Sequence, residues 1–127
     1  MWRLLASVLF LLSSGGAHAA EPLIRFASEK GEHVDIGADN LEEVRWVEDD
    51  LNGSRIFSFR LDRTSAELVG DLSLKLIHKP IKLIICGDLV AKPVVNEPLM
   101  HGSFHVAVET AQRAKMLADV LKRGNCE

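Results

Sequence analysis

The sequence lacks a hydrophobic run long enough to cross a membrane. Its longest mostly apolar run, Leu4–Leu12, has nine residues, whereas a membrane-spanning helix needs about 20 apolar residues. No internal repeat or low-complexity tract is present. The 15 lysines and arginines are outnumbered by 18 acidic residues and do not cluster, which argues against nucleic acid as a partner. We therefore expect no membrane span in the mature chain and no nucleic-acid binding.

Catalytic constellations are also lacking. The serines and cysteines have no identifiable base in their sequence context. Only His101 and His105 have a spacing that suits a metal, and on strand-like backbone they would be about 13 Å apart, too far for one ion. The pairs Asp49-Asp50 and Glu42-Glu43 are expected to point apart, into solvent. We predict no enzyme, no cofactor and no metal; a small hydrolase or metal enzyme is the weakest alternative.

The N-terminus has the pattern of a secretory signal peptide. Arg3 precedes the apolar run, and Ala17-His18-Ala19 has the small-x-small pattern of a signal peptidase site. A membrane anchor is the alternative, but the run is under half the length that it needs. We expect residues 1–20 to be removed and residues 21–127 to form one periplasmic or secreted domain. No feature of the sequence indicates an oligomeric state.

Six short strands are predicted in the mature chain, most of them in its first half. Asp39 is expected to cap a single helical turn at Leu41–Glu43. Asn52-Gly53 suits a hairpin loop, because both residues accept positive φ. Alternation predicts that one face of the strand after this loop lies in the core. The predicted strands are Leu23–Ala27, His33–Ile36, Val44–Glu48, Arg55–Leu61, Leu83–Cys86 and Phe104–Val108, and the predicted core face is Phe57, Phe59 and Leu61.

Two helices follow from capping signals and periodicity. Thr64-Ser65-Ala66-Glu67 has the spacing of a capping box, so the first helix is predicted to start at Thr64 and to end before Lys79-Pro80. Thr110 is predicted to cap the second, and Gly124 to take the left-handed position after it. The predicted buried stripes are Leu68, Val69, Leu72 and Leu76 in the first helix and Ala114, Leu117, Ala118 and Leu121 in the second.

The stretch from Lys82 to Gly102 organises the rest of the chain. Leu83–Cys86 is an unbroken apolar run, which predicts a strand buried on both faces. Pro93 and Pro98 then remove backbone donors from a segment that stays apolar. An apolar strip that a sheet cannot absorb commonly marks an interaction site; the alternative is that it folds back as core. The candidate partner-binding residues are Val94, Val95, Pro98, Leu99 and Met100.

Cys86 and Cys126 are the only two cysteines. Export to an oxidising compartment makes them a candidate disulfide. If the strand Phe104–Val108 pairs antiparallel with the strand that ends at Cys86, the last helix returns parallel to it and delivers Cys126 nearby. The alternative is a buried free Cys86 with an unattached Cys126.

Several segments together resemble one family. They are Phe59–Asp62, Lys79–Gly87, Lys92–Leu99 and Ala114–Gly124, within a similarity that runs from about Val34 to Asn125. The pattern is similar to the head subdomain of the first periplasmic domain of the SecD and SecDF translocon subunits. The spacing from Gly87 to Pro93 and the ending Ala-x-x-Leu-Ala-x-x-Leu-x-x-Gly carry the resemblance most specifically. The family tends to have glycine where this chain has His78 and Ala107.

The resemblance implies an α+β fold: a two-layer sandwich with a small mixed or antiparallel sheet and two main helices packed on one face. It also implies work outside the inner membrane, where this head captures polypeptide emerging from the channel. Helices that couple such capture to the proton gradient are not expected here, so only the binding role transfers. The expected partners are protein or unfolded polypeptide, with components of the Sec translocon as candidates. The alternative is an interaction module for one dedicated envelope partner.

Overall fold

The computed structural model describes residues 21–46 and 55–127, and in these residues the chain is α+β. The predicted signal peptide, the Asn52-Gly53 loop and the pair Asp49-Asp50 lie outside the described residues. In chain order the helices and strands are β1 (Ile24–Ala27), β2 (His33–Ile36), β3 (Leu41–Trp46), β4 (Ile56–Leu61), α1 (Arg63–Lys75), β5 (Lys82–Ile85), β6 (Asp88–Ala91), β7 (Ser103–Ala107) and α2 (Ala111–Arg123).

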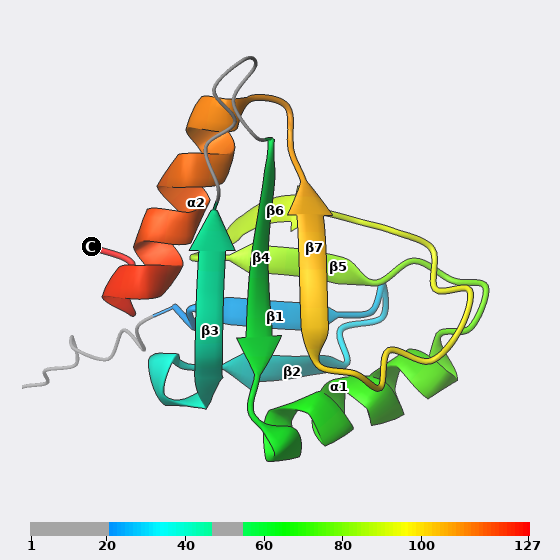
Figure 1. Cartoon of the computed structure of the whole chain (residues 1–127). Coiled ribbons are helices and arrows are strands. Elements are labelled where there is room, and N and C mark those ends of the chain that lie inside the picture. The colour runs from blue at the N-terminus through cyan, green and yellow to red at the C-terminus, as the bar shows by residue number, and fades with distance from the viewer. Residues whose placement is uncertain (1–20, 47–54) are drawn as a thin grey trace, which may run out of the picture.

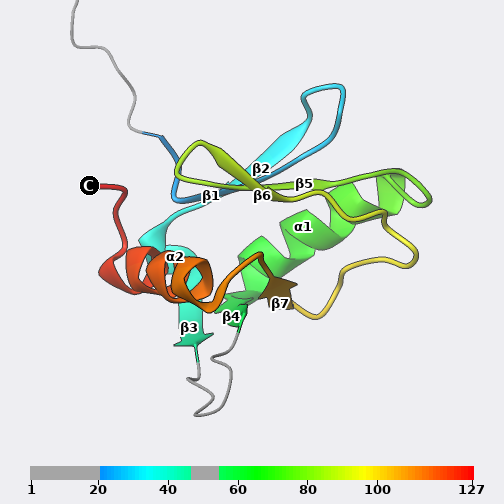
Figure 2. The same ribbon diagram turned by 90° about the horizontal axis from the view of Figure 1, so that it is seen from above.

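The described strands form two antiparallel sheets. The back sheet has the order β2-β1-β5-β6 and the front sheet the order β3-β4-β7, and the strands of one run crosswise to those of the other (Figure 1). Seen from above, α2 lies between the sheets on one side, and α1 runs from the end of β4 toward the back sheet on the other (Figure 2). The predicted α+β class is confirmed, but the strands form two sheets instead of one, because β7 pairs with β4 and not with β5.

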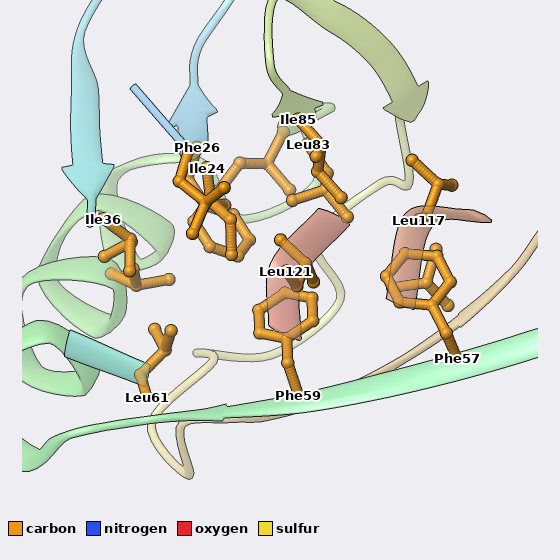
Figure 3. Packing of buried hydrophobic residues seen from close by; sticks show 14 of the residues in the cluster. Ile24, Phe26, Ile36, Phe57, Phe59, Leu61, Leu83, Ile85, Leu117 and Leu121 are labelled. Carbon is orange, nitrogen blue, oxygen red and sulfur yellow. The ribbon is translucent and has the colours of Figure 1, made fainter. Parts of the chain in front are cut away.

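The core lies where the two sheets face each other. Phe57, Phe59 and Leu61 of β4 are at most 3% exposed, as their alternation predicts. In Figure 3 they point toward residues of the back sheet, with Leu117 and Leu121 of α2 beside them. All four residues of the stripe predicted for α2 are buried. The front sheet, the back sheet and α2 therefore share one apolar core.

The strand β5 is buried on one face only. Leu83 and Ile85 are in the core, whereas Ile84 is partly exposed, so the prediction of burial on both faces is wrong. The reason is that both helices lie on the inner side of the back sheet (Figure 2). Positive φ at Cys86 (51°) and Gly87 (85°) closes a two-residue turn into β6. The strand β6 was not expected from the sequence.

The segment after β6, residues 92–102, is named the strap here. It is held to the residues after α1 by isolated bridges: the Val95 N–H donates to the Lys79 carbonyl (2.9 Å), and the His78 N–H donates to the Val95 carbonyl (2.7 Å). His78 takes a left-handed conformation with φ of 68°, at a position where the family tends to have glycine. The strap is therefore partly paired although Pro93 contributes no donor.

The helix caps agree with the sequence for α2 and differ for α1. Thr110 accepts from the Arg113 N–H (3.1 Å), and Gly124 is left-handed with φ of 81°, as predicted. In α1 the cap is Asp62 and not Thr64: its carboxylate accepts from the Ser65 N–H (2.8 Å). A second bond, from the Asn40 amide, is the main reason that the pKa of Asp62 lies below its usual value.

Two further local predictions are wrong. Leu41–Glu43 is not a helical turn, since a 3-10 turn occupies Ala38–Asn40 and β3 begins at Leu41. Leu68 of α1 is half-exposed (50%), because α1 buries only the face that carries Val69 and Leu72. In the first case the helical turn lies a few residues earlier than predicted. In the second case, tertiary packing buries a narrower face of the helix than the apolar pattern predicts.

Candidate binding groove

An open apolar groove of about 470 Å³ lies between β7 and the end of β6. We name it the intersheet groove, because one wall comes from the front sheet and its floor from the back sheet. All but two of its lining residues are apolar; the exceptions are Lys92 and His105. The lining residues are Phe26, Ile81, Leu83, Ala91, Lys92, Pro93, Leu99, Phe104, His105, Val106 and Ala107.

The two sheets position the apolar surface of this groove. Phe26 of β1 and Phe104 of β7 meet with ring centroids 5.0 Å apart, and Phe104 is also 5.2 Å from Phe59. These tilted and stacked rings fix the angle between wall and floor. Phe104 is only partly buried and Leu83 is 4% exposed, so the core itself comes to the surface here. Such a surface suits apolar side chains of a partner.

A charged pair lies at the rim. The Lys92 ammonium is 2.5 Å from a carboxylate oxygen of Glu29, and both side chains are nearly half-exposed. This contact is the main reason that the pKa of Glu29 is lowered; Lys82, 3.8 Å away, adds to it. Glu29 therefore pairs with Lys92, the one lysine that lines the groove, and with Lys82 beside it.

A second, smaller groove of about 270 Å³ continues from the first along the strap. It is named the strap groove, and it shares Ile81, Pro93 and Leu99 with the intersheet groove. Its other lining residues are Val94, Val95, Asn96 and Glu97. The two grooves are therefore adjacent and share apolar residues, while Asn96 and Glu97 add polar groups to the strap groove.

The structure divides the five candidate partner-binding residues. Val94 is 54% exposed in the strap groove, and Leu99, partly buried, lines both grooves. Val95 lines the strap groove but is only 3% exposed, so the expected exposure of its side chain is wrong. Both valines bridge the residues after α1, and along this extended backbone Val95 faces the core while Val94 faces outward. Pro98 and Met100 line neither groove, although Met100 is 51% exposed. Partner binding by Val94 and Leu99 stays a prediction.

Leu99 is held in place by α1. Its N–H donates to the hydroxyl of Ser73 (2.8 Å), and that hydroxyl donates to the Gly70 carbonyl (2.7 Å). Gly70 leaves room for the Met100 side chain beside α1, since a Cβ there would lie 2.6 Å from the sulfur of Met100. The prolines and this buried serine together fix the strap against the helix, so the groove is preformed.

Sequence reasoning missed the residues that the strands contribute to the groove. Phe26, Leu83 and Phe104 were each assigned to strands, but nothing local shows that strands of different sheets bring them together. The available signal was the apolar face of Phe104–Val108, whose partner strand was assigned incorrectly.

The candidate chemistry weighed from the sequence lies elsewhere. His101 is in the strap and His105 in β7, and the described residues hold no group of three or more metal-ligating side chains. Glu42 and Glu43 do not point apart as expected. A β-bulge at this point of β3 lets both carboxylates reach Arg60, at 3.3 Å each. This cluster is charge-paired and exposed, which is typical of a solvated surface.

The two cysteines are joined in the structure. Cys86 and Cys126 form a disulfide with their Cα atoms 5.5 Å apart. The expected route was wrong, because β7 pairs with β4 in the other sheet. The C-terminus of α2 reaches the β5–β6 turn instead from between the two sheets (Figure 2). The bond lies at the turn of that hairpin, whereas the intersheet groove lies at its open end.

Comparisons with known proteins identify the family. The model of the SecDF P1 head subdomain matches residues 24–126. The chain belongs to this family. Protein translocase subunit SecD of Rickettsia bellii (strain RML369-C) is 25% identical over 91 residues, which are 71% of this chain and 18% of that protein. The resemblance drawn from the sequence is thereby confirmed.

Solved structures of SecDF share the fold. A structure of SecDF, a membrane component that enhances protein export, has a TM-score of 0.58 and 20% identity, and the match covers 69% of this chain and 40% of that one. A crystal structure of SecDF in its super-membrane-facing form has the same TM-score and identity, over 69% of this chain and 12% of that one. The matches therefore cover between 12% and 40% of each relative's length. In residues 21–46 and 55–127, neither helix is long and apolar enough to cross a membrane.

Proposed function

We propose that this chain is a non-enzymatic periplasmic module of protein export that binds unfolded polypeptide in the intersheet and strap grooves. The observation that carries the proposal is the mostly apolar lining of the intersheet groove, three residues of which also line the adjacent strap groove. A groove with an apolar floor favours apolar side chains without selecting one sequence. Membership of the SecDF P1 head family supports a role beside the Sec machinery.

The proposed compartment rests on the N-terminal sequence and on the family. We propose that residues 1–20 are a cleaved signal peptide and that residues 21–127 act as one domain in the periplasm. The disulfide suits an oxidising compartment. Mass spectrometry of the exported protein is expected to find an N-terminus at Ala20 or Glu21; retention of Met1 contradicts the proposal.

Introducing a charge into the strap groove is expected to weaken binding. Val94→Asp places a carboxylate on an exposed apolar wall, where a bound apolar side chain would strip it of water. We expect about tenfold weaker binding, which corresponds to about 1.4 kcal/mol. The measurement is fluorescence anisotropy with a labelled secreted protein that is kept unfolded by reduction and alkylation.

The matched control is Leu89→Asp. Leu89 is 52% exposed, close to the 54% of Val94, but lies in β6 and lines neither groove. It is expected to leave both binding and melting temperature unchanged. Equal losses in the two variants, or wild-type protein that does not bind the unfolded polypeptide, would reject the proposed function.

A further inference from the structure

The strand β7 has one free edge, and its backbone groups can be assigned. The Leu61 N–H donates to the Gly102 carbonyl (2.8 Å), and the Val108 N–H donates to the Arg55 carbonyl (2.9 Å). In an antiparallel ladder such bonded pairs alternate with unbonded ones. The N–H and carbonyl groups of Ser103, His105 and Ala107 therefore point away from β4, toward the side where no described strand continues the front sheet (Figure 1).

This edge is the least protected of the four edges in the described sheets. Edge strands usually avoid unwanted pairing by means of charged side chains, proline or bulges. The edge strand β2 carries Asp35; β3 carries acidic residues and a bulge; β6 carries Asp88 and a shift in register. The residues of β7, Ser103–Ala107, include no aspartate, glutamate, lysine, arginine or proline; His105 is their one ionisable side chain, and their register with β4 is unbroken.

The free edge opens into the intersheet groove. His105 and Ala107, whose backbone groups face outward, line the groove together with Phe104 and Val106. A strand laid beside β7 would have main-chain partners along one side. Every second side chain of that strand would face the apolar floor at Leu83. The groove therefore offers backbone hydrogen-bond partners along β7 and an apolar floor, and a single extended chain matches both.

We propose that the polypeptide binds in extended form, as a strand added to β7. The partner is a segment with apolar residues at alternate positions, recognised through its backbone at His105 and Ala107 and through those side chains in the groove. This inference rests on the proposed function and specifies its substrate: extended chain, not amphipathic helix. Recognition of backbone groups gives binding with little sequence preference.

N-methylated peptides test the inference on the mature chain. The probe is a labelled synthetic peptide with alternating apolar and polar residues, together with two isomers that are methylated on alternate backbone nitrogens in one register or the other. Only one edge of the added strand faces β7. Methylation of that register is therefore expected to weaken binding about tenfold, and methylation of the other to change it little.

A variant pair tests the same edge from the protein side. Ala107→Pro removes one outward N–H without removing a bond to β4, and Ala107→Thr retains that N–H. The proline variant alone is expected to weaken binding severalfold, consistent with the loss of one hydrogen bond.

The possible failures are distinguishable. If the parent peptide binds but both methylated isomers bind equally well, strand addition is wrong and binding in the groove stands. If the parent peptide does not bind at all, the proposed function itself fails. If the chain forms a dimer in solution that Ala107→Pro dissociates, β7 pairs with a second copy and the inference is overturned.

Discussion

Replacing both Cys86 and Cys126 with serine is expected to lower the free energy of unfolding by about 4 kcal/mol, on the chain-entropy estimate for a loop of this length. The disulfide closes a loop across a sequence separation of 40 and joins the tail after α2 to the β5–β6 turn. Its loss frees the unfolded chain from that closure. Native contacts change little, because Leu117 and Leu121 still hold α2 in the core.

Urea unfolding at equilibrium measures this effect. Each single variant, Cys86→Ser or Cys126→Ser, breaks the same bond and is expected to match the double variant. Reduction of the wild-type protein should have the same result. Polypeptide binding by folded protein is expected to persist, since the bond lies at the other end of the hairpin from the groove. A loss below about 1 kcal/mol, or two free thiols in unfolded, unreduced protein, contradicts the expectation.

Phe59→Ala is expected to destabilise the protein by about 4 kcal/mol, within the range found for large-to-small changes of a buried phenylalanine. Phe59 is 2% exposed, and its ring lies 5.2 Å from Phe104 and 6.4 Å from Phe26. It therefore packs under both the wall and the floor of the intersheet groove. The loss combines the transfer energy of the ring with the cavity that it leaves between the two sheets.

Two variants control for this effect. Phe59→Leu keeps most of the volume and is expected to cost less than about 1.5 kcal/mol. Leu68→Ala removes an apolar side chain that is 50% exposed on α1, and is expected to stay within about 0.5 kcal/mol of the wild type. Urea unfolding that gives Phe59→Ala and Leu68→Ala similar losses would mean that Phe59 does not join the two sheets.

The elements that the sequence predicts best are those that local chemistry determines. Thr110 and Gly124 delimit α2 because a cap and a left-handed residue act within one turn. The alternation of side chains along the strand likewise predicts correctly that Phe57 and Phe59 are buried. Pairing partners are not local: nothing within Phe104–Val108 distinguishes β4 from β5 as its neighbour. Because Phe104–Val108 was expected to pair with Leu83–Cys86, one sheet was predicted where the structure has two.

The same limit explains how much of the groove could be predicted. Pro93 and Pro98 indicated that an apolar segment stays outside the sheets, which identified Val94 and Leu99. Val94 and Val95 both bridge the residues after α1, yet only Val95 is buried, and no local pattern shows which of the two faces the core. The floor of the intersheet groove could not be predicted, because it depends on how the two sheets face each other. That arrangement is set by contacts between residues that are distant in sequence.

Site-specific photocrosslinking in cells tests polypeptide binding in the grooves most directly. A photoreactive residue is placed at Val94 in the strap groove or at Met116 on α2; these side chains are 54% and 55% exposed. The account predicts crosslinks from Val94 to many newly exported polypeptides, and few from Met116, which lines neither groove. Equal crosslinking at the two positions, or a single crosslinked protein at Val94, would contradict it.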